Sequence, residues 1–147
     1  MTVVRIFGFP VEDGFQLQMQ PGVYNETAFL GLDTVIYEAS RAGLRVIIVL
    51  ANNWDYCGDW KCAYANFSAT VRDCDDFFTD PVAIQHYKRH AERMLMRVNH
   101  LTGVAYAHDP TIFGLAHHHG GTCQAAGAQP ARHNWAGRLL WESQLHV

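Results

Sequence analysis

The chain has 147 residues, of which 49% are hydrophobic and 17% charged, with a formal net charge of −3. This composition is that of one soluble globular domain, and it excludes a largely disordered chain. Because the 11 basic and 14 acidic residues are interspersed, neither a nucleic-acid-binding face nor a polybasic membrane patch is expected. No apolar run approaches the ~20 residues of a membrane span, and the first residues lack the features of a secretory signal peptide.

The first predicted element is a strand over residues 2–9, which are rich in β-branched and aromatic side chains. Arg5 interrupts it. A cation within a buried strand is costly unless it is paired, so Arg5 is interpreted either as half of a structural ion pair or as a site residue aimed at a carboxylate. Residues 11–24 are expected to form a loop.

Residues 26–42 are predicted to form an amphipathic helix, because their apolar side chains recur at three- and four-residue spacing. Asp33 is assigned to the opposite, polar face. Asn25 is the expected N-cap, and Gly43 is expected just beyond the C-terminus, where a left-handed conformation suits glycine.

A buried strand follows, and a polar cluster ends it. Residues 46–50 are apolar at every position, which is typical of a parallel strand covered on both faces. Asn52, Asn53 and Trp54 would emerge at its carboxyl end, where parallel sheets bind ligands. The alternative is that Trp54 only caps the core. Together these elements predict a βαβ unit.

Residues 55–79 are predicted to form a long loop, and loops of this length in compact domains are usually functional. Its aromatic side chains lie among aspartates, a mixture that suits the faces and hydroxyls of sugar rings. The residues alone favour the other interpretation, an aromatic cluster that holds the loop together. The aromatic residues are Tyr56, Trp60, Tyr64, Phe67, Phe77 and Phe78.

The cysteines and two sequons are further candidates for chemistry. The first two cysteines are spaced just outside the Cys-x2-4-Cys pattern of zinc sites, so a disulfide or free thiols are favoured over a metal site. Asn25-Glu26-Thr27 and Asn66-Phe67-Ser68 would accept N-linked glycans in a secreted chain, although such triplets often arise by chance. The cysteines are Cys57, Cys62, Cys74 and Cys123.

A second helix is predicted from Pro81 to Asn99, with Asp80 as its N-cap and proline at its first position. His86 and His90 are four residues apart and could chelate a metal ion. Without a third ligand they are expected to be surface or partly buried histidines.

A third strand is predicted to begin at residues 111–113, and the pattern changes after Gly114. Residues 115–147 lose periodicity and contain one acidic residue, Glu142, so they are expected to be an irregular, disordered tail. The expected division is therefore residues 1–114 and 115–147. The adjacent histidines 117–119 could bind a metal ion adventitiously.

Six ordered segments between residues 2 and 113 are informative when taken together. They are Val3-Val4-Arg5-Ile6-Phe7-Gly8-Phe9, Gln20-Pro21-Gly22-Val23-Tyr24, Asn52-Asn53-Trp54, Asp75-Asp76-Phe77-Phe78-Thr79-Asp80-Pro81, Arg97-Val98-Asn99, and Thr102-Gly103-Val104-Ala105-Tyr106 with Asp109-Pro110-Thr111-Ile112-Phe113. Together they resemble plant endo-β-1,4-mannanases of glycoside hydrolase family 5. The resemblance implies an α/β fold, a partial (β/α)8 TIM barrel of about three βα units similar to strands 2 to 4. It also implies a β-mannan substrate (mannan, galactomannan or glucomannan), no cofactor and secretion to the plant cell wall.

The resemblance assigns substrate-binding roles to Arg5, Phe7, Asn53 and Trp54. Arg5 matches an arginine that supports the nucleophile carboxylate. Phe7 stands where the family has tryptophan, so stacking is kept but an N–H donor is lost. Asn53 and Trp54 match the loop after the third barrel strand.

The same resemblance leaves both catalytic carboxylates unassigned. An ungapped continuation of the fourth barrel strand puts Gly120 at the position of the acid/base glutamate and His119 at that of a substrate-binding asparagine. No nucleophile is identifiable, and a retaining glycosidase needs both groups. We therefore expect an inactive family remnant, in which the reading frame or splicing departs from the family after Phe113. The alternatives are a non-catalytic mannan-binding protein and a protein that binds metal through its histidine-rich tail.

Overall fold

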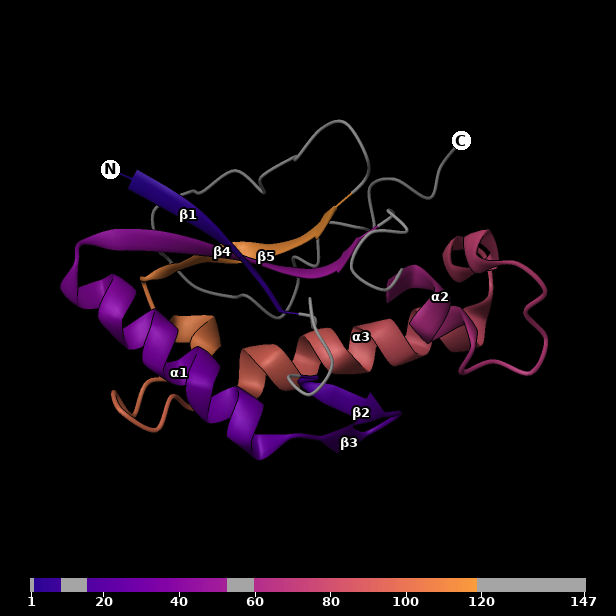
Figure 1. Cartoon of the computed structure of the whole chain (residues 1–147), viewed down its shortest axis with the longest axis horizontal. Helices are drawn as coiled ribbons and strands as arrows, with labels where there is room; N and C mark the ends of the chain where they lie inside the picture. The colour runs from indigo at the N-terminus through magenta and orange to yellow at the C-terminus, as the bar shows by residue number, and fades with distance from the viewer. Residues whose placement is uncertain (1, 9–15, 53–59, 119–147) are drawn as a thin grey trace.

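The computed structural model describes residues 2–8, 16–52 and 60–118. In Figure 1 the strands of its three-stranded sheet lie on one side of two long helices. The elements are β1 Thr2–Phe7, β2 Gln18–Gln20, β3 Val23–Tyr24, α1 Glu26–Arg41, β4 Leu44–Asn52, α2 Trp60–Ala65, η1 Cys74–Phe78, α3 Pro81–Met96, η2 Tyr106–His108 and β5 Ile112–His118.

The main sheet has the order β1-β4-β5, and both pairings are parallel. This confirms the parallel α/β architecture expected from the unbroken apolar run in β4. Four of the five residues in the run 46–50 are at most 1% exposed, namely Val46, Ile48, Val49 and Leu50. Within the described part of the sheet β1 and β5 are therefore the outer strands, and β4 is the central one.

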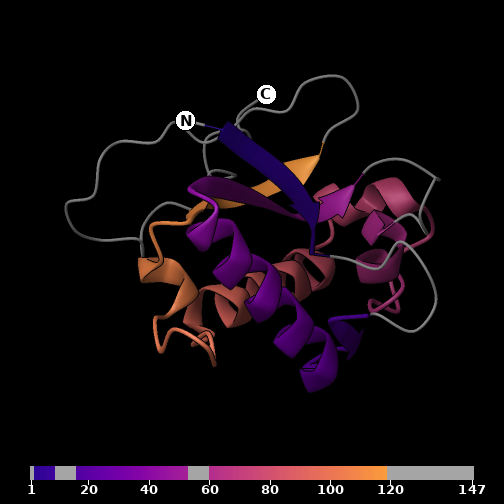
Figure 2. The ribbon, with the colours of Figure 1, turned by 60° about the vertical axis from the view of Figure 1, so that its left-hand side comes forward.

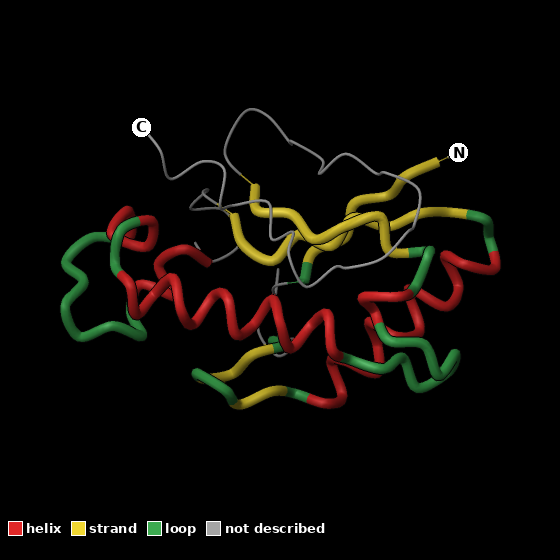
Figure 3. Tube along the Cα trace, turned by 180° about the vertical axis from the view of Figure 1, so that it is seen from behind, coloured by secondary structure: helices red, strands yellow, loops and turns green. Residues whose placement is uncertain are grey.

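The two helices α1 and α3 cover one face of this sheet. Figures 1, 2 and 3 agree on this layering, with both helices on the same side of β1, β4 and β5. A core fills the space between the layers, and it includes Phe29 and Ile36 of α1, Ile48 of β4, Met94 of α3 and Ile112 of β5. One apolar core thus fixes the two helices against the strands.

Helix α1 begins and ends as its sequence indicates. The side chain of Asn25 accepts a hydrogen bond from the backbone N–H of Ala28 at 3.3 Å, and Gly43 has a φ of 67°. The assignment of Asp33 to the polar face is wrong, because its side chain is completely buried. Asp33 follows Phe29 by four residues, so it lies within the apolar stripe of the helix.

Other boundaries also differ from the sequence predictions. The segment expected to be a loop over residues 11–24 contains the antiparallel hairpin β2–β3, whose turn has Gly22 at a φ of 76°. Helix α3 ends at Met96, three residues before the expected Asn99. Strand β5 continues to His118, beyond the expected change at Gly114.

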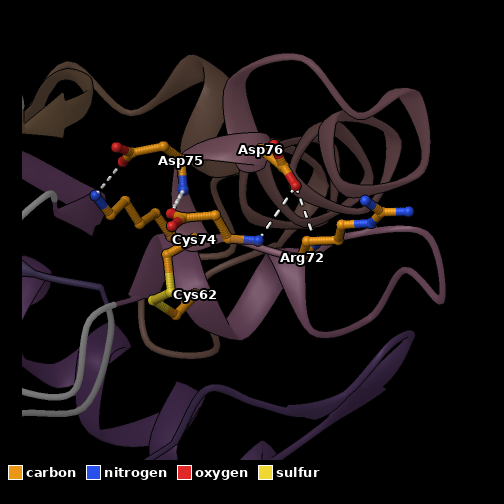
Figure 4. Close-up of a disulfide and its surroundings, with 7 residues drawn as sticks. Cys62, Arg72, Cys74, Asp75 and Asp76 are labelled. Carbon is orange, nitrogen blue, oxygen red and sulfur yellow. Dashed lines mark hydrogen bonds and ion pairs between the residues drawn. A yellow bond between two sulfur atoms is a disulfide. The ribbon is translucent and has the colours of Figure 1, made fainter.

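The predicted loop over residues 55–79 contains two short helices, α2 and η1, in its described part. A disulfide joins Cys62 to Cys74 and so ties these helices together (Figure 4). This confirms the preference for a disulfide or thiols over zinc at these two cysteines. In the described ranges no helix is both long enough and apolar enough to cross a bilayer.

Candidate functional site

The candidate site lies where the three parallel strands end. The register aligns Phe7 of β1 with Val49 of β4, and Val49 with Ala116 of β5. These three residues form one row across the sheet, and neighbouring strands lie about 4.8 Å apart. The carboxyl ends of all three strands therefore meet at one edge, which is where parallel sheets bind their ligands.

Gly8 closes β1 against β4 at this edge. Its backbone N–H donates to the carbonyl oxygen of Val49 at 2.7 Å. A Cβ atom at this position would lie 2.9 Å from Cγ2 of Ile48 and 3.1 Å from the carbonyl oxygen of Val49. Glycine therefore permits a close approach between the strand ends that a side chain would prevent.

Arg5 and Phe7 lie on the face of the sheet that the helices do not cover. Ile6, between them, packs into the helix-side core, and its register partner is Ile48. Because successive strand side chains point to opposite faces, Arg5 and Phe7 point away from α1 and α3. Arg5 is exposed, and Phe7 is 52% exposed. The position of Arg5 is therefore open to solvent, unlike the interior of a buried strand.

The other residues singled out from the sequence follow the strand ends. Asn52 and His118, the last residues of β4 and β5, are register partners. Asn53 and Trp54 come next after Asn52, and they lie outside the described residues. His119, Gly120 and Glu142, together with the rest of the expected tail, are also outside them.

A buried ion cluster, which the sequence reasoning missed, lies between α1 and the segment that precedes β5. Arg97 donates from Nε and Nη2 to the two carboxylate oxygens of Asp33, at 2.9 and 2.7 Å. The hydroxyl of Tyr106 donates to Oδ1 of Asp33, and the side-chain amide of Asn99 donates to the backbone oxygen of Asp33 at 3.0 Å. These bonds join α1 to the segment that leads from α3 into β5.

The electrostatics of this cluster favour the ionised pair. Burial raises the pKa of Asp33, but the hydrogen bonds from Arg97, Tyr106 and His100 outweigh it and lower the pKa below its ordinary value. Burial likewise lowers the pKa of Arg97, yet its bonds to Asp33 and Glu26 outweigh that effect and raise it. The guanidinium also stacks over the ring of Phe29 at 4.5 Å.

The loop between β4 and α3 is held by an aromatic cluster. Tyr64 and Phe77 are 2% and 5% exposed, and the ring of Tyr87 meets both of them edge-on. For these side chains the structure supports the interpretation that the sequence favoured, an aromatic cluster that holds the loop together. Tyr56 lies outside the described residues.

The described residues offer no arrangement for a metal. Within these ranges no group of three or more His, Cys, Asp or Glu side chains is placed to hold an ion. His86 packs edge-on against Phe67, whereas His90 is only 2% exposed and is more deeply buried than the sequence indicated. The side chains of the histidines at 117–119 lie outside the description, so metal binding by the tail stays a prediction.

The family profile for GH family 5 β-mannosidase-like proteins matches residues 9–137. The chain belongs to glycoside hydrolase family 5. The profile spans most of the chain and continues past Phe113, where the resemblance seen in the sequence ends.

Two plant relatives and two solved structures agree with this assignment. The chain is 48% identical over 117 residues to a putative mannan endo-1,4-β-mannosidase 9 of Oryza sativa subsp. japonica, covering 76% of this chain and 28% of the relative. It is 43% identical over 121 residues to mannan endo-1,4-β-mannosidase 3 of Arabidopsis thaliana, covering 78% and 28%.

The fold resembles that of the endo-1,4-β-mannanase from Rhizomucor miehei, with a TM-score of 0.69 at 31% identity, covering 80% of this chain and 35% of that one. The match to the endo-β-1,4-mannanase of Thermotoga petrophila has a TM-score of 0.68 at 32% identity, covering 78% and 27%. The family 5 chain thus has the fold of part of a TIM barrel. It spans about 28% of the length of these curated plant relatives.

Proposed function

We propose that this chain carries the substrate-facing strands of an endo-β-1,4-mannanase fold and that its 147 residues do not by themselves hydrolyse mannan. The proposal rests on the family resemblance, in which an ungapped continuation of β5 would put Gly120 at the position of the acid/base glutamate. The relatives named as mannan endo-1,4-β-mannosidases support the substrate class.

The chemistry explains why this substitution matters. A retaining glycosidase needs two carboxyl groups about 5 to 5.5 Å apart, one as nucleophile and one as acid/base. A positioned proton-transfer group contributes about 10² to 10⁴ in rate, and glycine can transfer no proton. After Phe113 the sequence contains one carboxylate side chain, Glu142, which cannot act on both sides of one bond.

We expect no release of reducing sugar from galactomannan by the 147-residue chain, produced in a host that lacks mannanase. The matched control is the Glu142→Gln variant, and a full-length plant relative assayed beside it verifies the substrate. Turnover above background that disappears in Glu142→Gln would contradict the proposal, because Glu142 would then be a working catalytic group.

A second candidate function is mannan binding without cleavage, and the position of Phe7 favours it. Phe7 is 52% exposed, and it lies on the sheet face that the helices do not cover, in the row of strand ends. An aromatic face at such an edge can stack on the C–H face of a sugar ring. Arg5 lies two residues earlier on the same face and can offer hydrogen-bond donors.

Replacing Phe7 with alanine is expected to weaken binding to galactomannan at least about fivefold, because truncating an aromatic contact residue costs about 1 kcal/mol or more. Migration through native gels containing galactomannan measures the effect. Val3→Ala is the matched control, since Val3 lies on the same face at the other end of β1 and is 39% exposed. Equal retardation of both variants and the unchanged chain would exclude Phe7 as a contact residue.

A further inference from the structure

Asn66 lies in a sequon on the surface, immediately after helix α2. We propose that Asn66 is a site of N-linked glycosylation. This inference goes beyond the proposed function and does not depend on it, because it concerns a surface turn between β4 and α3. The sequon is Asn66-Phe67-Ser68, and its middle residue is not proline, as the modification requires.

The local fold directs the asparagine outward. Asn66 is exposed, while Ala65 before it and Ser68 after it are buried. The ring of Phe67 packs edge-on against Tyr64, with centroids 6.0 Å apart. The neighbours of Asn66 therefore fix the turn to the protein. A glycan on its side-chain amide would project into solvent without displacing a packed group.

The disulfide that encloses this turn indicates the compartment that the modification requires. Cys62 and Cys74 flank Asn66 in the sequence, and they are bonded to each other (Figure 4). Disulfides form and persist in oxidising environments such as the lumen of the endoplasmic reticulum. N-linked glycans are attached in that same lumen. The disulfide and the sequon in this segment therefore both indicate the secretory pathway.

The hydroxyl group of the sequon residue Ser68 is hydrogen-bonded in the folded chain. Oγ of Ser68 is hydrogen-bonded to Oγ1 of Thr70 at 2.8 Å, and Thr70 donates to Oδ2 of Asp80 at 2.7 Å. Asp80 is the N-cap of α3. Because the transferase must reach the hydroxyl as well as the amide, the modification of Asn66 precedes the folding of this segment.

The second sequon provides a contrast within the same chain. Asn25 is half-buried, its Oδ1 accepts the capping bond from Ala28, and its backbone N–H donates to Leu17 at 2.9 Å. It sits where hairpin strand β3 enters α1, so its side chain has less room for a glycan than the exposed side chain of Asn66.

The transfer step is neutral in oxidation state. The bond that forms joins Nδ2 of Asn66 to the anomeric carbon of the first sugar. The bond that breaks joins this carbon to a phosphate oxygen of a polyisoprenoid diphosphate, the leaving group and donor lipid. The amide loses one proton, which balances the negative charge that the diphosphate leaving group gains. The co-reactant is therefore a lipid-linked oligosaccharide of the kind that the endoplasmic reticulum supplies.

The test is translation of the full chain, behind a heterologous signal peptide, in the presence of microsomes from the endoplasmic reticulum. A shift in gel mobility that an N-glycan-specific endoglycosidase reverses is expected. Asn66→Gln and Ser68→Ala should each lower the shift by one glycan, whereas Ser68→Thr and the control Asn25→Gln should keep the glycan at Asn66. No shift in the unchanged chain, or a single shift that survives Asn66→Gln, would overturn the assignment.

A second measurement tests the order of events and needs no variant. Purified chain with the Cys62–Cys74 disulfide formed is offered to detergent-opened microsomes, beside the same chain reduced and unfolded. Modification of the reduced chain alone is expected. Equal modification of both forms would show that the folded turn presents Ser68 to the transferase, although its hydroxyl is hydrogen-bonded to Thr70.

Discussion

Replacing Asp33 with alanine is expected to lower the free energy of unfolding by about 3–5 kcal/mol, the usual cost of removing one partner from a buried ion pair. Arg97 is 7% exposed, so it would keep its charge in a poorly solvated place and lose two hydrogen bonds. Tyr106 would lose the acceptor for its buried hydroxyl. Urea unfolding followed by far-ultraviolet circular dichroism measures the change.

The control for Asp33→Ala is Glu38→Ala on the same helix. Glu38 pairs with Arg41, but both side chains are more than half exposed, at 56% and 64%. Surface pairs of this kind contribute about 0–1 kcal/mol. If the two variants lost equal stability, Asp33 could not be the centre of a buried cluster.

The double variant Asp33→Leu with Arg97→Met separates the cost of an orphaned charge from the contribution of the pair. Replacing both ions with apolar side chains of similar size is often neutral or stabilising. We therefore expect the double variant to be more stable than either single one. A double variant whose loss equals the sum of the single losses would indicate that the two residues act independently.

The long elements of this fold could be predicted from the sequence, because their signals are local. The apolar run of β4 indicates a covered parallel strand. Asn25 and Gly43 mark the ends of α1 through the capping bond and the positive φ that the structure contains. Asp80 and the proline after it mark the start of α3 in the same way. Each of these signals depends on residues that are close together in the sequence.

The short elements could not be predicted, because contacts distant in the sequence stabilise them. Strands β2 and β3 have three and two residues, which is too few to show an alternating pattern. Helix α2 has six residues, and isolated helices of this length are unstable in water. A disulfide and the aromatic cluster around Tyr64 hold α2 in place, and sequence spacing did not reveal which cysteines pair.

The candidate site could be predicted only in part, because some of its contacts join residues that are distant in the sequence. The family resemblance singled out Phe7, and the register aligns it with Val49 near the carboxyl end of β4. Asp33 was misassigned, because an acid inside an apolar stripe has no partner visible nearby in the sequence. Its partner, Arg97, is 64 residues away. An ionisable residue at a core position of a helix is itself the signal that could have revealed the cluster.

Lowering the pH from 6.5 to 4 is expected to reduce stability by roughly 3 kcal/mol through His90 alone, since each unit of pKa difference corresponds to about 1.4 kcal/mol. Burial lowers the pKa of His90 from 6.5 to about 4. Below pH 6.5 the unfolded chain therefore takes up a proton at this histidine while the folded chain does not. The stabilisation is complete above pH 6.5 and is lost as the pH falls towards 4.

The surroundings of His90 explain why its ring stays neutral. The ring stacks on Tyr24, with centroids 5.7 Å apart and planes at 12°, and Tyr64 lies on it at 6.2 Å. Loss of solvation on burial is the cause of the lowered pKa of His90. Among the described side chains, Nδ1 of His90 is the buried polar atom without a hydrogen-bond partner, so protonation would gain no acceptor there.

The variant His90→Phe keeps a stacked ring but removes the titrating nitrogen atoms, so it isolates this effect. Unfolding free energies of both proteins are measured in urea between pH 7 and pH 4, and the difference between the two curves is compared. His86, His100 and His108 are present in both proteins, so their contributions cancel. Asp33 loses its own contribution only as the pH falls below its ordinary pKa of 3.8, because its folded pKa is lower still. The unchanged chain should therefore lose stability more steeply than His90→Phe between pH 6.5 and 4, and parallel curves would mean that His90 is accessible to protons in the folded state.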